Sequence, residues 1–281
     1  MAGKQTPGMS GEKKTKQQRR DEAREKARIL REQEAKRAKR NRILMIVGAV
    51  LLVAVVVFAV VKVLTSSDDS KADGNYGGEV RALELKNVDT ADMGVYVGAS
   101  GKAGETNAGV PVVGIWSDMM CGGCQRLAMT YDETFQNFAA KGDLNFKIYP
   151  VSTLNSEYSR QAAAAVYYVA TYAPEYTGQL NDALMRLGAN AHQTQVPPNP
   201  VDIAEAAKQV GVPEDVVKDL ADTIMAKEWL ELSDKTTKEF RDRGFGATPT
   251  ITVNDTEDNS WLDDGGSVEK LLENAAAKAG K

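Results

Sequence analysis

The chain has 281 residues, 42% of them hydrophobic, which is enough for one sizeable core or two small ones. Its two cysteines and single histidine argue against a structural zinc site, which needs four ligands. The formal net charge of −4 combines +9 over residues 1–42 with −14 over residues 65–281. The basic segment contains interleaved acidic residues and no aromatic side chain for base stacking, so no nucleic-acid partner is expected.

The N-terminal part of the chain predicts a membrane anchor. Ile43 to Val61 is a run of 19 residues without a charged or polar side chain, and about 20 apolar residues in a helix cross the hydrocarbon core of a bilayer. We therefore predict a basic cytoplasmic segment over 1–42, a single transmembrane helix over 43–64 and a linker over 65–78. The basic cluster Lys36–Arg42 lies directly before the span, so the positive-inside rule places the N-terminus in the cytoplasm.

A cleaved signal peptide is the alternative for this apolar run. Signal peptides have a shorter apolar region and a small-x-small cleavage site soon after it. Residues 63–66, Val-Leu-Thr-Ser, provide no clear site of this kind, so a retained anchor is favoured. Under both interpretations the larger domain is exported, and the expected location is the cell membrane, single-pass, with the lipid bilayer as a partner.

The pattern after the linker predicts an α/β domain that a helical block interrupts. Strands are expected at Val80–Leu85, Gly94–Val97, Val110–Trp116, Asp143–Pro150 and Thr250–Val253, where apolar residues alternate or cluster. Ser156 begins a long stretch with helical periodicity, in which Asn190–Pro200 is expected to be a loop, and a last helix includes Val268 and Leu272. The predicted parts are 79–151 and 244–281 for the α/β domain and 152–243 for the insertion.

Cys121 and Cys124 form the motif Cys-Gly-Gly-Cys between a predicted strand and a predicted helix. Two residues three apart on a helix share one face, which suits a disulfide. A disulfide across so short a loop restrains little of the unfolded chain, so a redox role is favoured over a stabilising one. Cys121 lies nearer the helix N-terminus, whose dipole and free N–H groups favour a thiolate, so we assign it as the attacking thiol and Cys124 as the resolving thiol.

Two polar residues have alternative interpretations. Asp118, three residues before Cys121, is either a charge that tunes the thiol or a helix-capping carboxylate. His192 lies in the predicted loop Asn190–Pro200 and is interpreted as a solvated residue rather than a catalytic base.

A second motif places Thr248 and Pro249 at the start of a predicted strand. The sequence from Trp116 to Cys124 (WSDMMCGGC) and that from Gly246 to Asn254 (GATPTITVN) resemble the thioredoxin superfamily. The helical block between them resembles the DsbA branch, in particular the membrane-anchored DsbA-like oxidoreductases of Gram-positive bacteria. The resemblance implies a thioredoxin-like fold with an inserted all-helical domain, a cis peptide bond before Pro249, and a substrate-binding role for Thr248 and Pro249. Gly122 and Gly123 depart from the family, which often has Pro or His between the cysteines.

The resemblance implies an extracytoplasmic thiol-disulfide oxidoreductase that introduces disulfides into exported proteins with free cysteines. It also implies a membrane reoxidase of the DsbB or VKOR type as a partner, and neither a cofactor nor a metal is expected. A disulfide reductase or isomerase, for example in cytochrome c maturation, is the first alternative. A non-catalytic thioredoxin-like binding module is the second.

Overall fold

A computed structural model describes residues 76–278, and they form a mixed α/β domain. Six strands build one sheet in the order β1-β2-β4-β3-β5-β6. Their bounds are Val88–Asp89 (β1), Gly94–Val97 (β2), Val112–Asp118 (β3), Asn145–Val151 (β4), Thr250–Val253 (β5) and Thr256–Glu257 (β6). The central pair β3 and β4 is parallel, and the other pairs are antiparallel.

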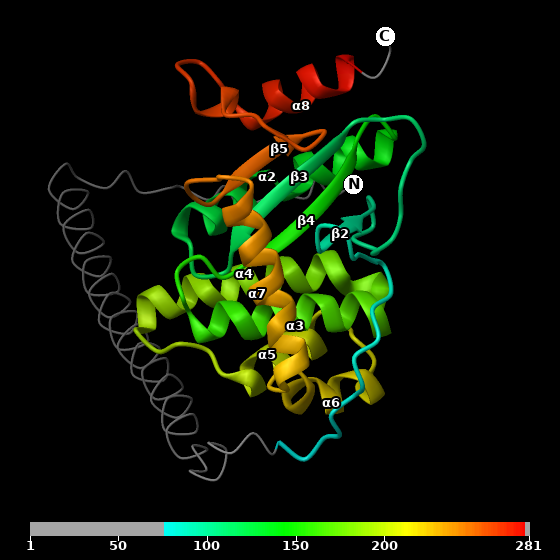
Figure 1. Cartoon of the computed structure of the whole chain (residues 1–281), viewed down its shortest axis with the longest axis vertical. Helices are drawn as coiled ribbons and strands as arrows, with labels where there is room; N and C mark the ends of the chain where they lie inside the picture. The colour runs from blue at the N-terminus through cyan, green and yellow to red at the C-terminus, as the bar shows by residue number, and fades with distance from the viewer. Residues whose placement is uncertain (1–75, 279–281) are drawn as a thin grey trace, which may run out of the picture. The chain divides into compact units, whose positions relative to one another are not determined.

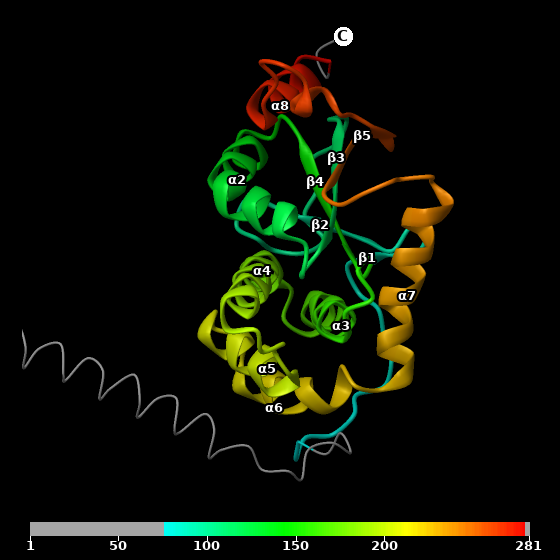
Figure 2. The ribbon, with the colours of Figure 1, turned by 90° about the vertical axis from the view of Figure 1, so that its left-hand side faces the viewer.

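Helices cover both faces of this sheet (Figure 2). Helices α2 (Gly122–Lys141) and α8 (Val268–Ala277) pack on one face around Val113, Leu127 and Leu271. Helix α7 (Lys227–Asp242) packs on the other face, where Phe240 contacts the stacked rings of Trp116 and Tyr149. Because adjacent strand residues point to opposite faces, Val113 and Trp116 reach these two different layers.

The regular elements between β4 and β5 are all helices, as the sequence predicts (Figure 1). It contains α3 (Glu157–Tyr172), the 3-10 turn Pro174–Tyr176, α4 (Thr177–Thr194), α5 (Pro200–Gln209), α6 (Glu214–Thr223) and α7. In helix α3 all residues from Ala162 to Ala170 are hydrophobic and fully buried, as expected for a helix segment surrounded by other elements. Ser156 caps α3 by accepting a hydrogen bond from the Ser159 N–H.

Two predicted elements differ in the structure. Residues Val80–Leu85 are not a strand, because their polar groups bond to helices of the insertion: the Arg81 N–H donates to Thr223 Oγ1, and the Trp229 indole N–H donates to the Arg81 carbonyl. The predicted loop 190–200 begins later, because α4 continues to Thr194 and ends at Gln195, which has a left-handed backbone.

The predicted membrane span 43–64 and the basic segment 1–42 lie outside the described residues, as does nearly all of the linker 65–78. Within 76–278, none of the helices is both long enough and apolar enough to cross a bilayer.

Candidate active site

The two cysteines lie where β3 ends and α2 begins. Cys121 is the N-cap residue of α2 and has an extended backbone, with φ −81° and ψ 116°. Its position leaves the N–H groups of the first helical turn without a side-chain cap. The backbone N–H groups of Gly123 and Cys124 lie near the Cys121 sulfur and lower its pKa. The helix N-terminus is therefore directed at one sulfur atom.

The environment of Cys121 favours its thiolate. Its pKa is lowered to about 5, chiefly because the Cys124 thiol donates a hydrogen bond to its sulfur. Hydrogen bonds from the Thr248 side chain and from the Gly123 and Cys124 N–H groups lower the pKa further, while partial burial opposes them. Cys121 is thus a partly exposed thiol that ionises below neutral pH.

Cys124 has the opposite properties. Its side chain is only 1% exposed, and its pKa is raised because it is the donor to Cys121 and because it is buried. Both cysteines are free thiols in this structure. At neutral pH these opposite pKa shifts favour a proton on the buried Cys124 sulfur and a negative charge on Cys121.

Thr248 and Pro249 lie beside the cysteines, although 127 residues separate Cys121 from Thr248. Strand β5 runs antiparallel to β3 with Thr250 opposite Trp116, so its first residues arrive at the end of β3. The Cys121 sulfur lies 3.2 Å from the Thr248 carbonyl oxygen, to which it donates a hydrogen bond when it is protonated. The Thr248–Pro249 peptide bond is cis, which confirms the prediction from the family resemblance.

The second glycine of the motif touches this proline. A Cβ atom added at Gly123 would lie 3.0 Å from Pro249 Cδ, closer than ordinary van der Waals contact, whereas one at Gly122 would meet only the Arg126 guanidinium at 3.8 Å. Gly123 therefore allows a close approach between the motif and the cis-proline, and Gly122 has free space around it.

Asp118 is fully buried and its carboxylate is saturated with hydrogen bonds. It accepts from the Met120 N–H at 2.9 Å, the Leu154 N–H at 2.9 Å, the Thr153 hydroxyl at 3.2 Å and the Ser159 hydroxyl at 2.6 Å. Met120 belongs to the turn before Cys121, Thr153 and Leu154 to the connection between β4 and α3, and Ser159 to the first turn of α3. None of these donors belongs to α2, whose N-cap is Cys121, so the Asp118 carboxylate does not cap that helix. It connects the turn before Cys121 to residues 153–159.

His192 differs from its prediction as a solvated loop residue. It is exposed but belongs to the last turn of α4, and its Nε2 atom lies 3.0 Å from the Met120 carbonyl oxygen. The sequence analysis also missed Gln125, whose buried amide donates to the Met119 carbonyl over 2.9 Å. Neither contact has a sequence signal, because each depends on how a helix packs against the turn.

A cavity of about 430 Å³ lies behind Cys124, between α2, α4 and the sheet. Phe135 and Met185 contribute apolar walls, and Asp132 and Asp182 add two carboxylates from facing helices. Burial and the nearby Asp132 charge raise the pKa of Asp182. In the described part of the chain, no three His, Cys, Asp or Glu side chains are grouped as metal ligands.

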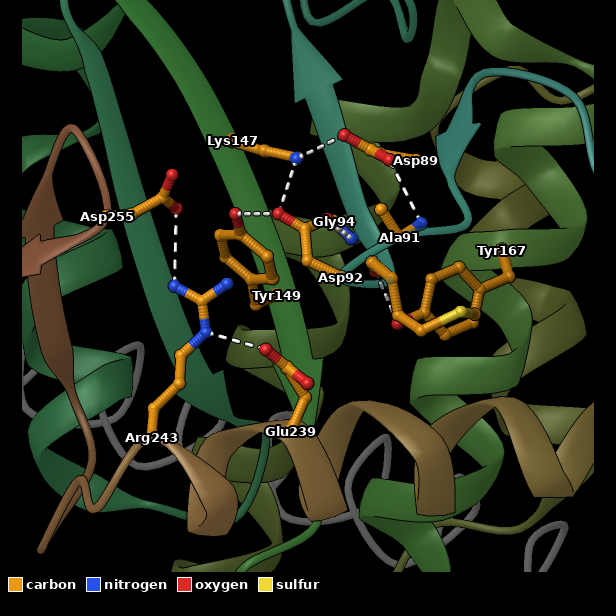
Figure 3. Close-up of polar contacts among 11 residues, drawn as sticks. Asp89, Ala91, Asp92, Gly94, Lys147, Tyr149, Tyr167, Glu239, Arg243 and Asp255 are labelled. Carbon is orange, nitrogen blue, oxygen red and sulfur yellow. Dashed lines mark hydrogen bonds and ion pairs between the residues drawn. The ribbon is translucent and has the colours of Figure 1, made fainter.

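A polar network supports β4 on the sheet face opposite α2 (Figure 3). The ammonium group of Lys147, a buried residue, donates to Asp89 at 2.8 Å and to Asp92 at 2.6 Å, and the Tyr149 hydroxyl donates to Asp92 at 2.8 Å. The Tyr149 ring stacks on Trp116 of β3 with centroids 3.8 Å apart. The network thus connects β4 to the strand that leads into the cysteine motif.

Arg243 completes the same face. Its guanidinium lies 5.3 Å from the centre of the Trp116 ring. Glu239 and Asp255 hold it through ion pairs of 2.8 and 3.2 Å, as Figure 3 shows. The Trp116 ring therefore contacts both the Arg243 guanidinium and the Tyr149 ring.

Comparisons with known proteins agree with this fold. No curated protein matches the chain significantly in sequence. Among solved structures, MdbA, a thiol-disulfide oxidoreductase from Actinomyces oris, has 20% identity and a TM-score of 0.56, over 72% of this chain and 98% of that one. MdbA from Corynebacterium diphtheriae has 17% identity and a TM-score of 0.53, over 73% and 100% of the two chains. Oxidised BdbD from Bacillus subtilis has 19% identity and a TM-score of 0.52, over 65% and 92%.

At these identities the structural matches establish the fold, and the family follows from the sequence model. The model described as thioredoxin matches residues 98–271, which include both cysteines, the helical insertion and the cis-proline. Because this match spans more than half of the sequence, the chain belongs to the thioredoxin family.

Proposed function

We propose that this protein is an extracytoplasmic thiol-disulfide oxidoreductase that introduces disulfides into exported proteins. One observation carries the proposal: a partly exposed Cys121 with a pKa lowered to about 5 lies beside a buried Cys124 with a raised pKa, next to a cis-proline. Pairs of this kind exchange disulfides because one sulfur is both a good nucleophile and a good leaving group.

The lowered pKa of Cys121 supports the oxidising direction. A stabilised thiolate stabilises the reduced enzyme, and this makes the disulfide form a stronger oxidant. The pKa of about 5 for Cys121 lies between the values of roughly 3.5 for DsbA and 7 for thioredoxin. The lowered pKa therefore supports oxidation of substrates over their reduction.

The proposed cycle starts from the Cys121–Cys124 disulfide. A substrate thiolate attacks Cys121 Sγ, which forms a mixed disulfide and releases the Cys124 sulfur; that sulfur takes up a proton. A second substrate thiolate then attacks the substrate sulfur of the mixed disulfide and releases the Cys121 thiolate. The substrate loses two electrons and gains a disulfide, and the enzyme gains two electrons as a thiolate and a thiol.

The reduction potential of the Cys121–Cys124 pair tests this direction. The full-length protein would be equilibrated in glutathione buffers, and its thiols trapped and counted by mass spectrometry. A potential near the DsbA value of about −120 mV supports an oxidase, and one near the thioredoxin value of about −270 mV makes the protein a reductase. A Cys121→Ala variant that still complements a deletion strain would instead indicate a non-catalytic binding module.

We also propose that residues 43–64 anchor the domain in the membrane, with the N-terminus in the cytoplasm. The apolar run and the basic cluster before it support this topology. A membrane protein of the DsbB or VKOR type would then reoxidise the Cys121–Cys124 pair. Protease treatment of intact cells tests the topology: degradation of the C-terminal domain supports it, and protection of that domain contradicts it.

A further inference from the structure

Four hydrogen bonds hold the backbone of the turn 119–121, which leads into the cysteine motif. The Met120 N–H donates to the Asp118 carboxylate, and the Cys121 N–H donates to the Asp118 carbonyl, each over 2.9 Å. Gln125 holds the Met119 carbonyl, and His192 holds the Met120 carbonyl. The first three bonds come from residues 118–125, which are local to the motif. His192 alone among these partners comes from the helical insertion, 72 residues further along the chain.

Helix α4 makes a second contact with the same turn, one helical turn before His192. A Cβ atom at Gly188 would overlap the Met119 carbonyl oxygen, so the missing side chain allows α4 to lie directly against it. Positions 188 and 192 are four residues apart and share one face of the helix. The face that carries Gly188 and His192 therefore lies against two successive carbonyl groups, those of Met119 and Met120.

The bond from His192 has a defined polarity. A carbonyl oxygen only accepts hydrogen bonds, so Nε2 carries the hydrogen whether the ring is neutral or charged. The acceptor belongs to the peptide group that joins Met120 to Cys121. The orientation of this peptide determines where the Cys121 sulfur lies relative to the N–H groups of Gly123 and Cys124 that lower its pKa.

We infer that His192 is a positioning residue for Cys121: it attaches the active-site turn to the helical insertion and keeps the sulfur aligned with the start of α2. The inference rests on the proposed function and adds a role for the insertion in it. The Gly122-Gly123 dipeptide provides no side chain that could hold the turn from within the motif, and α4 provides this contact from outside.

The test is a titration of the Cys121 thiol in full-length protein with the variants His192→Leu and His192→Gln. The rate of alkylation would be followed from pH 3 to pH 9, together with thiolate absorbance. His192→Leu removes the donor, so the Cys121 sulfur loses its alignment with the start of α2. We expect the pKa of Cys121 to rise by about one unit, the size of one weakened hydrogen bond to the thiolate. At pH 5 this lowers the thiolate fraction about fivefold. His192→Gln retains an N–H donor, and we expect a pKa close to that of the wild type.

Asn190→Leu is the matched control. It makes the same kind of change in the same helix at another exposed residue, and positions two apart do not share a helix face. The control should titrate like the wild type. If His192→Leu also titrates like the wild type, the positioning role is wrong while the proposed function stands. If the wild-type pKa of Cys121 itself lies near 8.5, the value of a free cysteine, the proposed function fails.

A measurement on the unmodified protein covers the case in which His192→Leu does not fold. His192 is the only histidine in the chain, so its ring gives a single set of NMR signals. We expect the Nε2 signal to shift when Cys121 and Cys124 are oxidised, because the Met120 peptide that it holds is adjacent to Cys121. Ring signals and a ring pKa that are identical in both redox states would overturn the inference.

Discussion

Alanine at the two glycines between the cysteines gives a matched test of the active-site geometry. Both glycines lie in the first turn of α2, where alanine is favoured over glycine by about 0.5–1 kcal/mol. The methyl group of Gly122→Ala has free space, with only the flexible Arg126 guanidinium nearby at 3.8 Å. We therefore expect Gly122→Ala to raise the unfolding temperature of the reduced protein by about 1–4 °C, since 1 kcal/mol corresponds to roughly 2–4 °C for a domain of this size.

Gly123→Ala gains the same backbone contribution but places its methyl group 3.0 Å from Pro249 Cδ. Overpacking of this kind costs about 1–3 kcal/mol, because the neighbouring chain must shift. The expected net result is a loss of roughly 0–2.5 kcal/mol, from the difference between the two contributions. Thermal unfolding followed by circular dichroism measures both variants under the same reducing conditions. Equal stabilisation by the two substitutions would refute the close contact between the motif and the cis-proline.

Three further predictions concern buried charges. Asp118→Ala leaves the Ser159 hydroxyl and two backbone N–H groups without their acceptor, so the free energy of unfolding measured in urea should fall by about 3 kcal/mol or more. A stable Asp118→Asn variant with an altered reduction potential would instead support a tuning role. The pKa of Asp182 is raised in the folded state, so the folded state binds a proton that the unfolded state has lost, and stability should fall as the pH rises from about 4 through this pKa. Asp182→Asn should remove that pH dependence, and an unchanged dependence contradicts the assignment. Lys147→Met leaves two carboxylates without their buried cation and should lower the free energy of unfolding by about 3–5 kcal/mol. The control Lys86→Met breaks only an exposed ion pair with Glu84 and should lower it by about 0–1 kcal/mol. Similar losses for both variants would show that the Lys147 network contributes little.

The sequence by itself predicted the elements whose signals are local. An apolar run and a helical pattern meet at Cys121, so the strand–motif–helix junction was foreseeable, and so was the helical block after Ser156. The roles of the two thiols also follow from local position, because the end of a helix and its N–H groups lie within a few residues of the motif. The cis bond at Thr248–Pro249 came from the family resemblance rather than from the residues.

Only the tertiary structure decided which distant groups reach the cysteines. Residues Val80–Leu85 have the alternating pattern of a strand, but a strand needs a neighbouring edge, and here side chains of α6 and α7 bond to the backbone instead. His192 reaches the Met120 carbonyl because α4 continues past Asn190 and because Gly188 allows it to approach. Spacing along a chain determines the faces of a helix, whereas the partner of each face depends on how the helices pack, and that information is spread over the whole core.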